Sequence, residues 1–149
     1  MCDYSLGLVN SRPARVGDRL VSTGFKNTVT RGLSAEDQPD TAVCLLPGTE
    51  VVFDRRARYT FGPLGLFSWR TRSPLARFRQ INTADPYVHH DALEFADGRV
   101  ISLQSLALGQ RASVLQLPAE GQNGSSVESR PRPAEAPALA VQVPVAVQG

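Results

Sequence analysis

Short runs of alternating apolar and polar residues are the feature that most restricts the fold of this chain. Within residues 1–117 the apolar runs are short and mostly of period two, and no window of eleven or more residues repeats apolar positions convincingly at helical spacing. A period of two is typical of strands with one buried face, whereas an amphipathic helix needs a period near 3.6. The pattern therefore predicts an all-β (mainly β) fold, a small antiparallel barrel or a two-layer sandwich with long loops.

The predicted strands follow from these runs and from the turn residues between them. We expect strands at residues 19–23, 42–46, 49–53, 75–81, 91–95, 99–103 and 112–117. A Pro-Gly pair at 47–48 predicts a hairpin between the second and third strands, and an Asp-Gly pair at 97–98 predicts another between the fifth and sixth. Residues 31–40 and 60–74 are expected to be long loops, and 102–108 is expected to contain one helical turn.

The composition of the chain changes after Leu117. Residues 118–149 contain no aromatic residue and are rich in Pro, Ala, Gly, Ser and Gln. Such a segment cannot bury enough apolar surface to offset the conformational entropy that ordering would remove. We therefore expect one globular domain over 1–117, followed by a disordered Pro/Ala-rich tail over 118–149.

The charge of the chain argues against some classes of protein. Its 149 residues include 16 Lys plus Arg and 14 Asp plus Glu, a formal net charge of +2, which is too small to indicate a general nucleic-acid-binding protein. Lys26 is the only lysine, and this bias toward arginine is typical of GC-rich coding, so we interpret the chain as bacterial in type. It has neither an apolar run of about 18 residues nor a basic, apolar leader, so we expect no membrane span and a cytoplasmic location.

All the cysteines and histidines of the chain together form the first candidate site. They are Cys2, Cys44, His89 and His90. Two thiols and two imidazoles match the ligand set of tetrahedral zinc, and the same groups suit copper or non-haem iron. The first hypothesis is therefore a transition-metal centre (Zn, Fe or Cu) with a redox or sensing role. The spacing is unlike that of known zinc motifs, because adjacent histidines on a strand point to opposite faces.

Each of these ligands also has a simpler interpretation. Cys2 becomes a free N-terminal aminothiol if the initiator methionine is removed, but a terminal residue is commonly frayed. Cys44 lies in an apolar run, where a buried thiol is expected, and a disulfide between the two cysteines is not expected in the cytoplasm. The carboxylate of Asp91 can orient a neighbouring imidazole, although histidines in loops are usually just solvated.

The second candidate site is a run of arginines and aromatic residues between positions 55 and 79, without any acidic residue. The arginines are Arg55, Arg56, Arg58, Arg70, Arg72, Arg77 and Arg79, and Tyr59, Phe61, Phe67, Trp69 and Phe78 lie among them. Guanidinium groups and aromatic rings are the groups with which proteins bind single-stranded nucleic acids. The alternative hypothesis is therefore a non-enzymatic binding module for an anionic partner, such as single-stranded nucleic acid or an acidic protein segment.

Other interpretations of the same run remain open. Its apolar residues could pack on another protein or a second copy of the chain, enter a membrane interface, or cover a pocket. The arginines could instead be neutralised across the sheet by acids such as Glu50, Asp54 and Glu94. The sequence contains no glycine-rich phosphate loop, nucleophile elbow, zinc-protease motif or calcium loop, so it does not indicate a catalytic mechanism.

Overall fold

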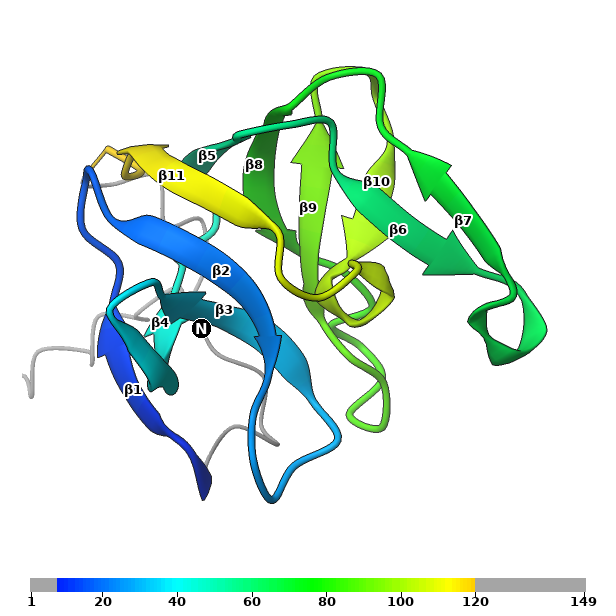
Figure 1. Ribbon diagram of the computed structural model, residues 1–149, viewed down its shortest axis with the longest axis horizontal. Coiled ribbons are helices and arrows are strands. Elements are labelled where there is room, and N and C mark those ends of the chain that lie inside the picture. The colour runs from blue at the N-terminus through cyan, green and yellow to red at the C-terminus, as the bar shows by residue number, and fades with distance from the viewer. Residues whose placement is uncertain (1–7, 120–149) are drawn as a thin grey trace, which may run out of the picture.

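The computed structural model describes residues 8–119, and within this part the regular secondary structure is almost entirely β-strand, with two short 3-10 helices and no α-helix (Figure 1). The elements are β1 (Asn10–Pro13), β2 (Arg19–Gly24), β3 (Arg31–Ala35), β4 (Gln38–Cys44), β5 (Glu50–Phe53), β6 (Arg58–Phe61), η2 (Pro63–Gly65), β7 (Phe67–Arg70), β8 (Leu75–Gln80), β9 (Asp91–Phe95), β10 (Val100–Ser102), η3 (Leu103–Ser105) and β11 (Arg111–Gln116). Cys2 and all but the first two residues of the predicted tail lie outside the described residues. Nothing helical among residues 8–119 has the length and apolar character needed to cross a lipid bilayer.

Nine of these strands form one open sheet, and β6 and β7 form a separate hairpin. The order in the sheet is β1-β4-β3-β2-β11-β5-β8-β9-β10, and all of its strand pairs are antiparallel except β1 with β4. Figure 1 shows β1 to β4 on one side of the molecule and β8 to β10 on the other. The predicted all-β fold is confirmed, but the sheet has two edges, β1 and β10, and does not close into a barrel.

The sheet curves around a single main core. Leu20 of β2, Leu33 of β3, Phe78 of β8 and Leu93 of β9 are each at most 2% exposed and belong to one hydrophobic cluster. Because these strands come from both halves of the strand order, the sheet must bend to bring them together. Burial in β8 alternates as predicted, with Ala76 and Phe78 inside. Alternation thus sets which face of each half-buried strand meets the core.

The two predicted hairpins have different outcomes. The hairpin at 97–98 is confirmed, because β9 pairs with β10 and Gly98 has the positive φ of 84° that its turn requires. The prediction of a hairpin at 47–48 is wrong. A turn is present there, with the Thr49 N–H donating to the Leu46 carbonyl, but β5 pairs with β11 and β8 rather than with β4. The Pro-Gly turn fixes the local reversal of the chain and not the partner of the strand that follows.

The two predicted long loops are largely strands. Residues 31–40 contain β3 and the beginning of β4, and residues 60–74 contain the end of β6 and the whole of β7. In β3 the last four residues are all buried, so the strand has no exposed face to produce alternation. The helical turn expected within 102–108 is present as η3.

The turn between β1 and β2 depends on one carboxylate. Asp18 accepts hydrogen bonds from the Arg12 guanidinium at 2.8 and 3.2 Å and from the Arg15 N–H at 2.8 Å. The hydrogen bond with Arg12 is the largest influence and lowers the pKa of Asp18, although burial acts in the opposite direction. A carboxyl group whose pKa is lower in the folded state stabilises the protein above its unfolded pKa, and this stabilisation is lost as the pH falls through the folded pKa.

We therefore expect the free energy of unfolding to decrease below about pH 4, near the pKa of an unfolded aspartate. The Asp18→Asn variant should lose about 1–3 kcal/mol at pH 7 and show a shallower decrease with acid. Urea denaturation at a series of pH values measures both effects. Asp40→Asn is the matched control, because that side chain is 78% exposed and 3.9 Å from Lys26. An unchanged pH dependence in the Asp18 variant would contradict the prediction.

Candidate functional site

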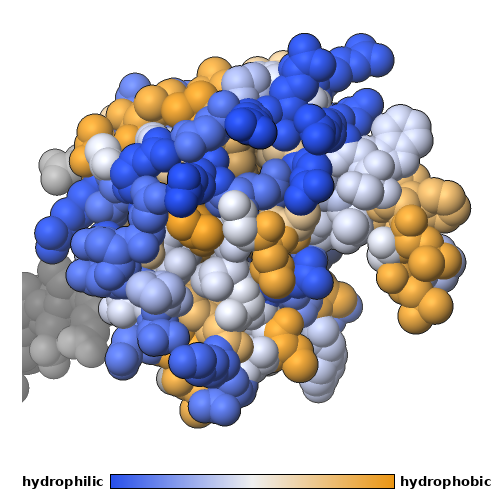
Figure 2. Space-filling view, in the orientation of Figure 1, coloured by the Kyte–Doolittle hydropathy of each residue, from blue (hydrophilic) through white to orange (hydrophobic). Residues whose placement is uncertain are grey.

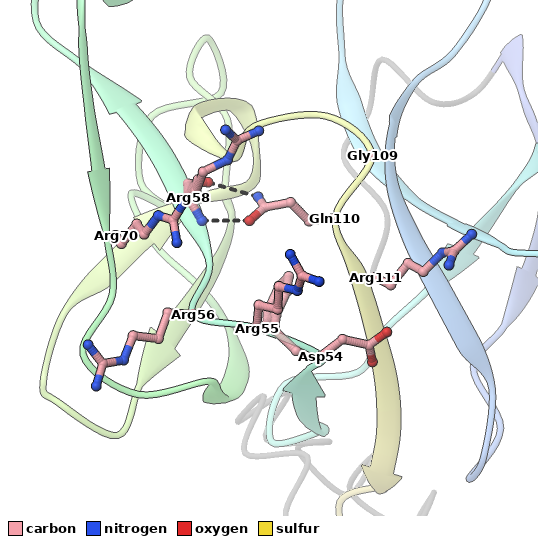
Figure 3. A pocket seen from close by; sticks show the side chains of 9 residues that line it. Asp54, Arg55, Arg56, Arg58, Arg70, Gly109, Gln110 and Arg111 are labelled. Atoms are coloured by element: carbon pink, nitrogen blue, oxygen red, sulfur yellow. Dashed lines mark hydrogen bonds between the residues drawn. The ribbon is translucent and has the colours of Figure 1, made fainter.

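A hollow lined by arginines lies where the β6–β7 hairpin joins the main sheet (Figure 3). Its volume is about 550 Å³. The lining residues come from the segment after β5, from both hairpin strands and from the beginning of β11: Phe53, Asp54, Arg55, Arg56, Arg58, Arg70, Gly109, Gln110 and Arg111. Five of these nine residues are arginines and one is acidic, so the hollow can receive a negatively charged group.

The base of the hairpin is fixed by a buried threonine. The Thr71 N–H donates to the Ala57 carbonyl at 2.9 Å, and the Ala57 N–H donates to Thr71 Oγ1 at 3.0 Å. The same hydroxyl donates to the Ser73 carbonyl at 2.7 Å. Ala57 is fully buried and Thr71 is 1% exposed, while the adjoining Arg56 and Arg58 are exposed. This anchor holds the two arginines at the surface on either side of a buried residue.

Gln110 connects the hairpin to the main sheet. Its side-chain amide accepts from the Arg58 N–H at 2.5 Å and donates to the Arg58 carbonyl at 2.8 Å. It also donates to the Ala107 carbonyl at 2.9 Å. The amide thus satisfies the two backbone groups of Arg58, as the dashed lines in Figure 3 show. These bonds place Arg58 at the hollow while leaving its guanidinium available.

The one acidic residue of the hollow is paired outside it. The Asp54 carboxylate accepts two hydrogen bonds from the Arg19 guanidinium, at 2.8 and 3.0 Å. This pairing lowers the pKa of Asp54. In Figure 3 the carboxylate points toward the side of Arg111 and away from Arg70. Asp54 therefore does not neutralise the arginines of the hairpin.

Most of the arginines near the hollow have no acidic partner. Arg111 pairs with Glu36 at 3.0 Å. Among the described arginines around the hollow and the hairpin, those that form no ion pair are Arg55, Arg56, Arg58, Arg70 and Arg72. The first four line the hollow. The hollow therefore contains four arginines whose positive charge is not neutralised by an ion pair.

Arg58 and Arg70 lie directly opposite each other in the hairpin register. Side chains at such positions share one face, and like charges there repel each other. An anion bound between them would remove this repulsion and could accept two hydrogen bonds from each planar guanidinium group. Their position makes this pair the centre of the candidate site.

The aromatic residues of the hairpin lie on its other face. Tyr59 lies opposite Trp69, one position along each strand from the arginines, and Phe61 lies opposite Phe67, three positions from them. The Phe61 ring centroid is 5.5 Å from that of Phe67 and 5.9 Å from that of Trp69. Because successive strand residues alternate between faces, arginines and aromatic rings that are interleaved in sequence are separated in space. Trp69, grouped with the arginines from the sequence, therefore does not line the hollow.

The remaining arginines of the run lie elsewhere. Arg77 pairs with Glu50 at 2.8 Å and Arg79 pairs with Glu94 at 2.9 Å, so these two are neutralised across the sheet. The backbone N–H of Arg72 donates to the Asp97 carboxylate at 2.7 Å, outside the hollow. The seven arginines thus divide into a neutralised pair on β8 and an uncompensated group around the hairpin.

The hypothesis of a Cys/His metal centre is wrong for the described part of the chain. Among residues 8–119 no three His, Cys, Asp or Glu side chains are grouped so that they could hold a metal ion. Cys44 ends β4, whereas both histidines lie in the loop between β8 and β9, and four strands separate β4 from β8 in the sheet. The imidazole of His90 is bonded through Nε2 to the Asp85 carbonyl at 2.8 Å. The loop expected around the histidines is present, and within it the His90 side chain is hydrogen-bonded to the loop backbone at Asp85.

The state of Cys44 also differs from the sequence-based expectation. The residue is half-buried and disulfide-bonded, rather than a free thiol in the core. A cysteine in a disulfide is not available as a thiolate ligand. Cys2 lies outside the described residues.

Three residues of the candidate site were not identified from the sequence. Gln110 and Arg111 reach the hollow through the pairing of β11 with β5, and Thr71 acts through hydrogen bonds to Ala57 on the other side of the hairpin base. None of the three belongs to a local motif, so no sequence signal indicated them. No known family, curated protein or solved structure matches this chain.

Proposed function

We propose that this protein is a binding module for an anionic ligand that carries phosphoryl groups, held in the arginine hollow. The single observation that carries the proposal is the opposed pair Arg58 and Arg70, which has no acidic partner among the described residues. The planar fork of each guanidinium matches the oxygens of a phosphoryl group. With Arg55 and Arg56 beside the pair, the hollow suits a ligand with more than one negative charge.

The size and the lining of the hollow support a small ligand. Its volume of about 550 Å³ lies in the range of small-molecule sites. The alternative of a stacked single strand of nucleic acid has less support, because the rings of Phe61, Phe67 and Trp69 lie on the opposite face from Arg58 and Arg70. A base stacked on these rings and a phosphate held by these arginines would not share one surface.

Titration calorimetry with inorganic tripolyphosphate tests the proposal. A charge-assisted hydrogen bond contributes about 1.5–3 kcal/mol, so the double variant Arg58→Gln/Arg70→Gln should bind about a hundredfold more weakly. The matched control is Arg77→Gln/Arg79→Gln, which removes the same charge from arginines already paired with Glu50 and Glu94. The control should keep its affinity within about twofold, since distant surface charges are screened by salt.

Three results would overturn the proposal. The first is that the unmodified protein does not bind tripolyphosphate. The second is an equal loss of affinity in both double variants, which would indicate general charge attraction rather than a site. The third is binding of a single-stranded oligonucleotide that Trp69→Ala weakens as much as the Arg58/Arg70 double variant does, which would favour nucleic acid as the ligand.

A further inference from the structure

The end of the β6–β7 hairpin carries exposed apolar side chains that do not line the hollow. Its apolar side chains are largely exposed, with Leu64 94%, Leu66 72% and Phe67 54% accessible. Phe61 and Trp69, at 45% and 53%, extend this apolar tip along one face of the hairpin. Figure 2 shows the hydrophobic residues gathered at the end of the hairpin, away from the body of the molecule. A concentration of large apolar side chains at one projecting point indicates a contact surface.

The backbone of the tip presents one of these leucines in an unfavourable conformation. Leu64 has a φ of 63°, in the left-handed region, between Gly62 and Gly65, which also have positive φ. Glycine or asparagine adopts this conformation more readily than leucine. The chain thus places a large apolar residue where a small or polar one would fold more easily, and this points to a role for the side chain outside the fold.

The charge around the tip indicates the nature of its partner. Residues 55–84 contain no Asp or Glu. Arg58 and Arg70 stand at the base of the hairpin, and Arg70 is three positions along the strand from Phe67, a distance of about 10 Å. Apolar groups at a membrane interface are buried about 5–10 Å into the boundary between headgroups and acyl chains. With the tip at that depth, these two arginines would reach the level of the lipid phosphates.

We propose that the apolar tip docks into the headgroup region of an anionic lipid bilayer, with Arg58 and Arg70 contacting lipid phosphates. Leu64 and Leu66 lie at the very end of the hairpin, and Trp69 and then Arg70 follow toward its base. This order matches the change in polarity across a bilayer interface, from acyl chains to charged headgroups. The uncompensated positive charge complements anionic lipids, which attract basic groups near the surface. This docking depends on the exposed tip, and it requires no soluble ligand in the hollow.

Trp69 supplies an intrinsic reporter for this contact, because it is the only tryptophan of the chain. The full-length protein is mixed with vesicles of equal parts phosphatidylglycerol and phosphatidylcholine, or with vesicles of phosphatidylcholine alone. With the anionic vesicles we expect sedimentation of the protein and a blue shift of the tryptophan emission, both reduced by added salt. Vesicles of phosphatidylcholine alone should bind at least tenfold more weakly.

The double variant Leu64→Asp/Leu66→Asp should weaken binding to the anionic vesicles at least tenfold. The matched control is Val16→Asp/Val29→Asp, which places the same charge on side chains that are 62% and 90% exposed elsewhere. All four side chains are exposed, so both variants should keep the melting temperature of the parent. The tip variant should still bind tripolyphosphate, which separates this docking from ligand binding in the hollow.

Several outcomes would overturn the docking proposal. One is vesicle binding that the tip variant leaves unchanged, and another is an equal loss in the tip and control variants. A third is a dimer, seen by light scattering, that disappears in the tip variant while vesicles are not bound, since the tip would then contact a second copy of the chain. If the protein binds anionic vesicles through its tip but does not bind tripolyphosphate, only the proposed ligand site in the hollow is refuted.

Discussion

The Arg70→Glu variant is expected to bind tripolyphosphate at least a hundredfold more weakly than the unmodified protein and yet to unfold at a higher temperature. The loss of affinity follows because a donor of the hollow becomes a repelling carboxylate. The gain in stability follows because a repelling pair becomes an attracting one, since Arg58 lies directly opposite in the hairpin register. Cross-strand pairs of opposite charge contribute about 0.2–1 kcal/mol. Calorimetry measures both the binding and the unfolding.

The control for this variant has the opposite expected pattern. Arg79 is already paired with Glu94 at 2.9 Å, so Arg79→Glu should lower the melting temperature and leave tripolyphosphate binding nearly unchanged. The two variants alter the net charge of the chain by the same amount. If they change affinity equally, or if Arg70→Glu is destabilised, Arg58 and Arg70 are not an uncompensated pair.

Truncation of one core side chain should have the largest effect on folding. Phe78 is 1% exposed, and its backbone is bonded on both sides, to the Thr49 carbonyl and the Gly48 N–H, each at 2.8 Å. We expect Phe78→Ala to lose about 3–5 kcal/mol of unfolding free energy, because the cavity cannot be filled by its packed neighbours. Urea denaturation at neutral pH measures this loss.

Leu75 provides the comparison on the same strand. It lies on the opposite face of β8 and is 38% exposed, so Leu75→Ala should lose less than about 1 kcal/mol. Similar losses in the two variants would show that β8 does not bury the face that carries Phe78.

Strands with one exposed face were predictable from the sequence, and strands without that contrast were not. β2 covers the predicted residues 19–23, and burial alternates along both β2 and β8. β9, at the predicted residues 91–95, is the exception: it is almost wholly buried, and the Asp-Gly turn that follows it indicated its position. β3 was not predicted because its last four residues are all buried. The hairpin strands β6 and β7 were not predicted because most of their residues are exposed. The Pro-Gly turn at 47–48 was recognised, but which strands pair with β5 depends on contacts distant in sequence, which local turn chemistry does not determine.

The candidate site was predictable only as a list of arginines. The run between 55 and 79 contains four of the five arginines that line the hollow, but their pairing with acids depends on the register of the sheet. Arg77 lies opposite Glu50 because β5 pairs with β8, and no sequence signal indicates that pairing. The separation of Arg70 from Trp69 does follow from alternation, once the hairpin is recognised as strands.

The attachment of the hairpin has a consequence for how such a protein can evolve. Of the residues described in β6 and β7, Tyr59 packs against the main core, and the other contacts to the body are hydrogen bonds such as those of Gln110. The core therefore places few demands on the remaining hairpin residues. Selection could replace the tip or the arginines, and so change what is recognised, without requiring compensating changes in the interior. Under the proposed function, folding and ligand recognition would therefore be largely independent traits of one small chain.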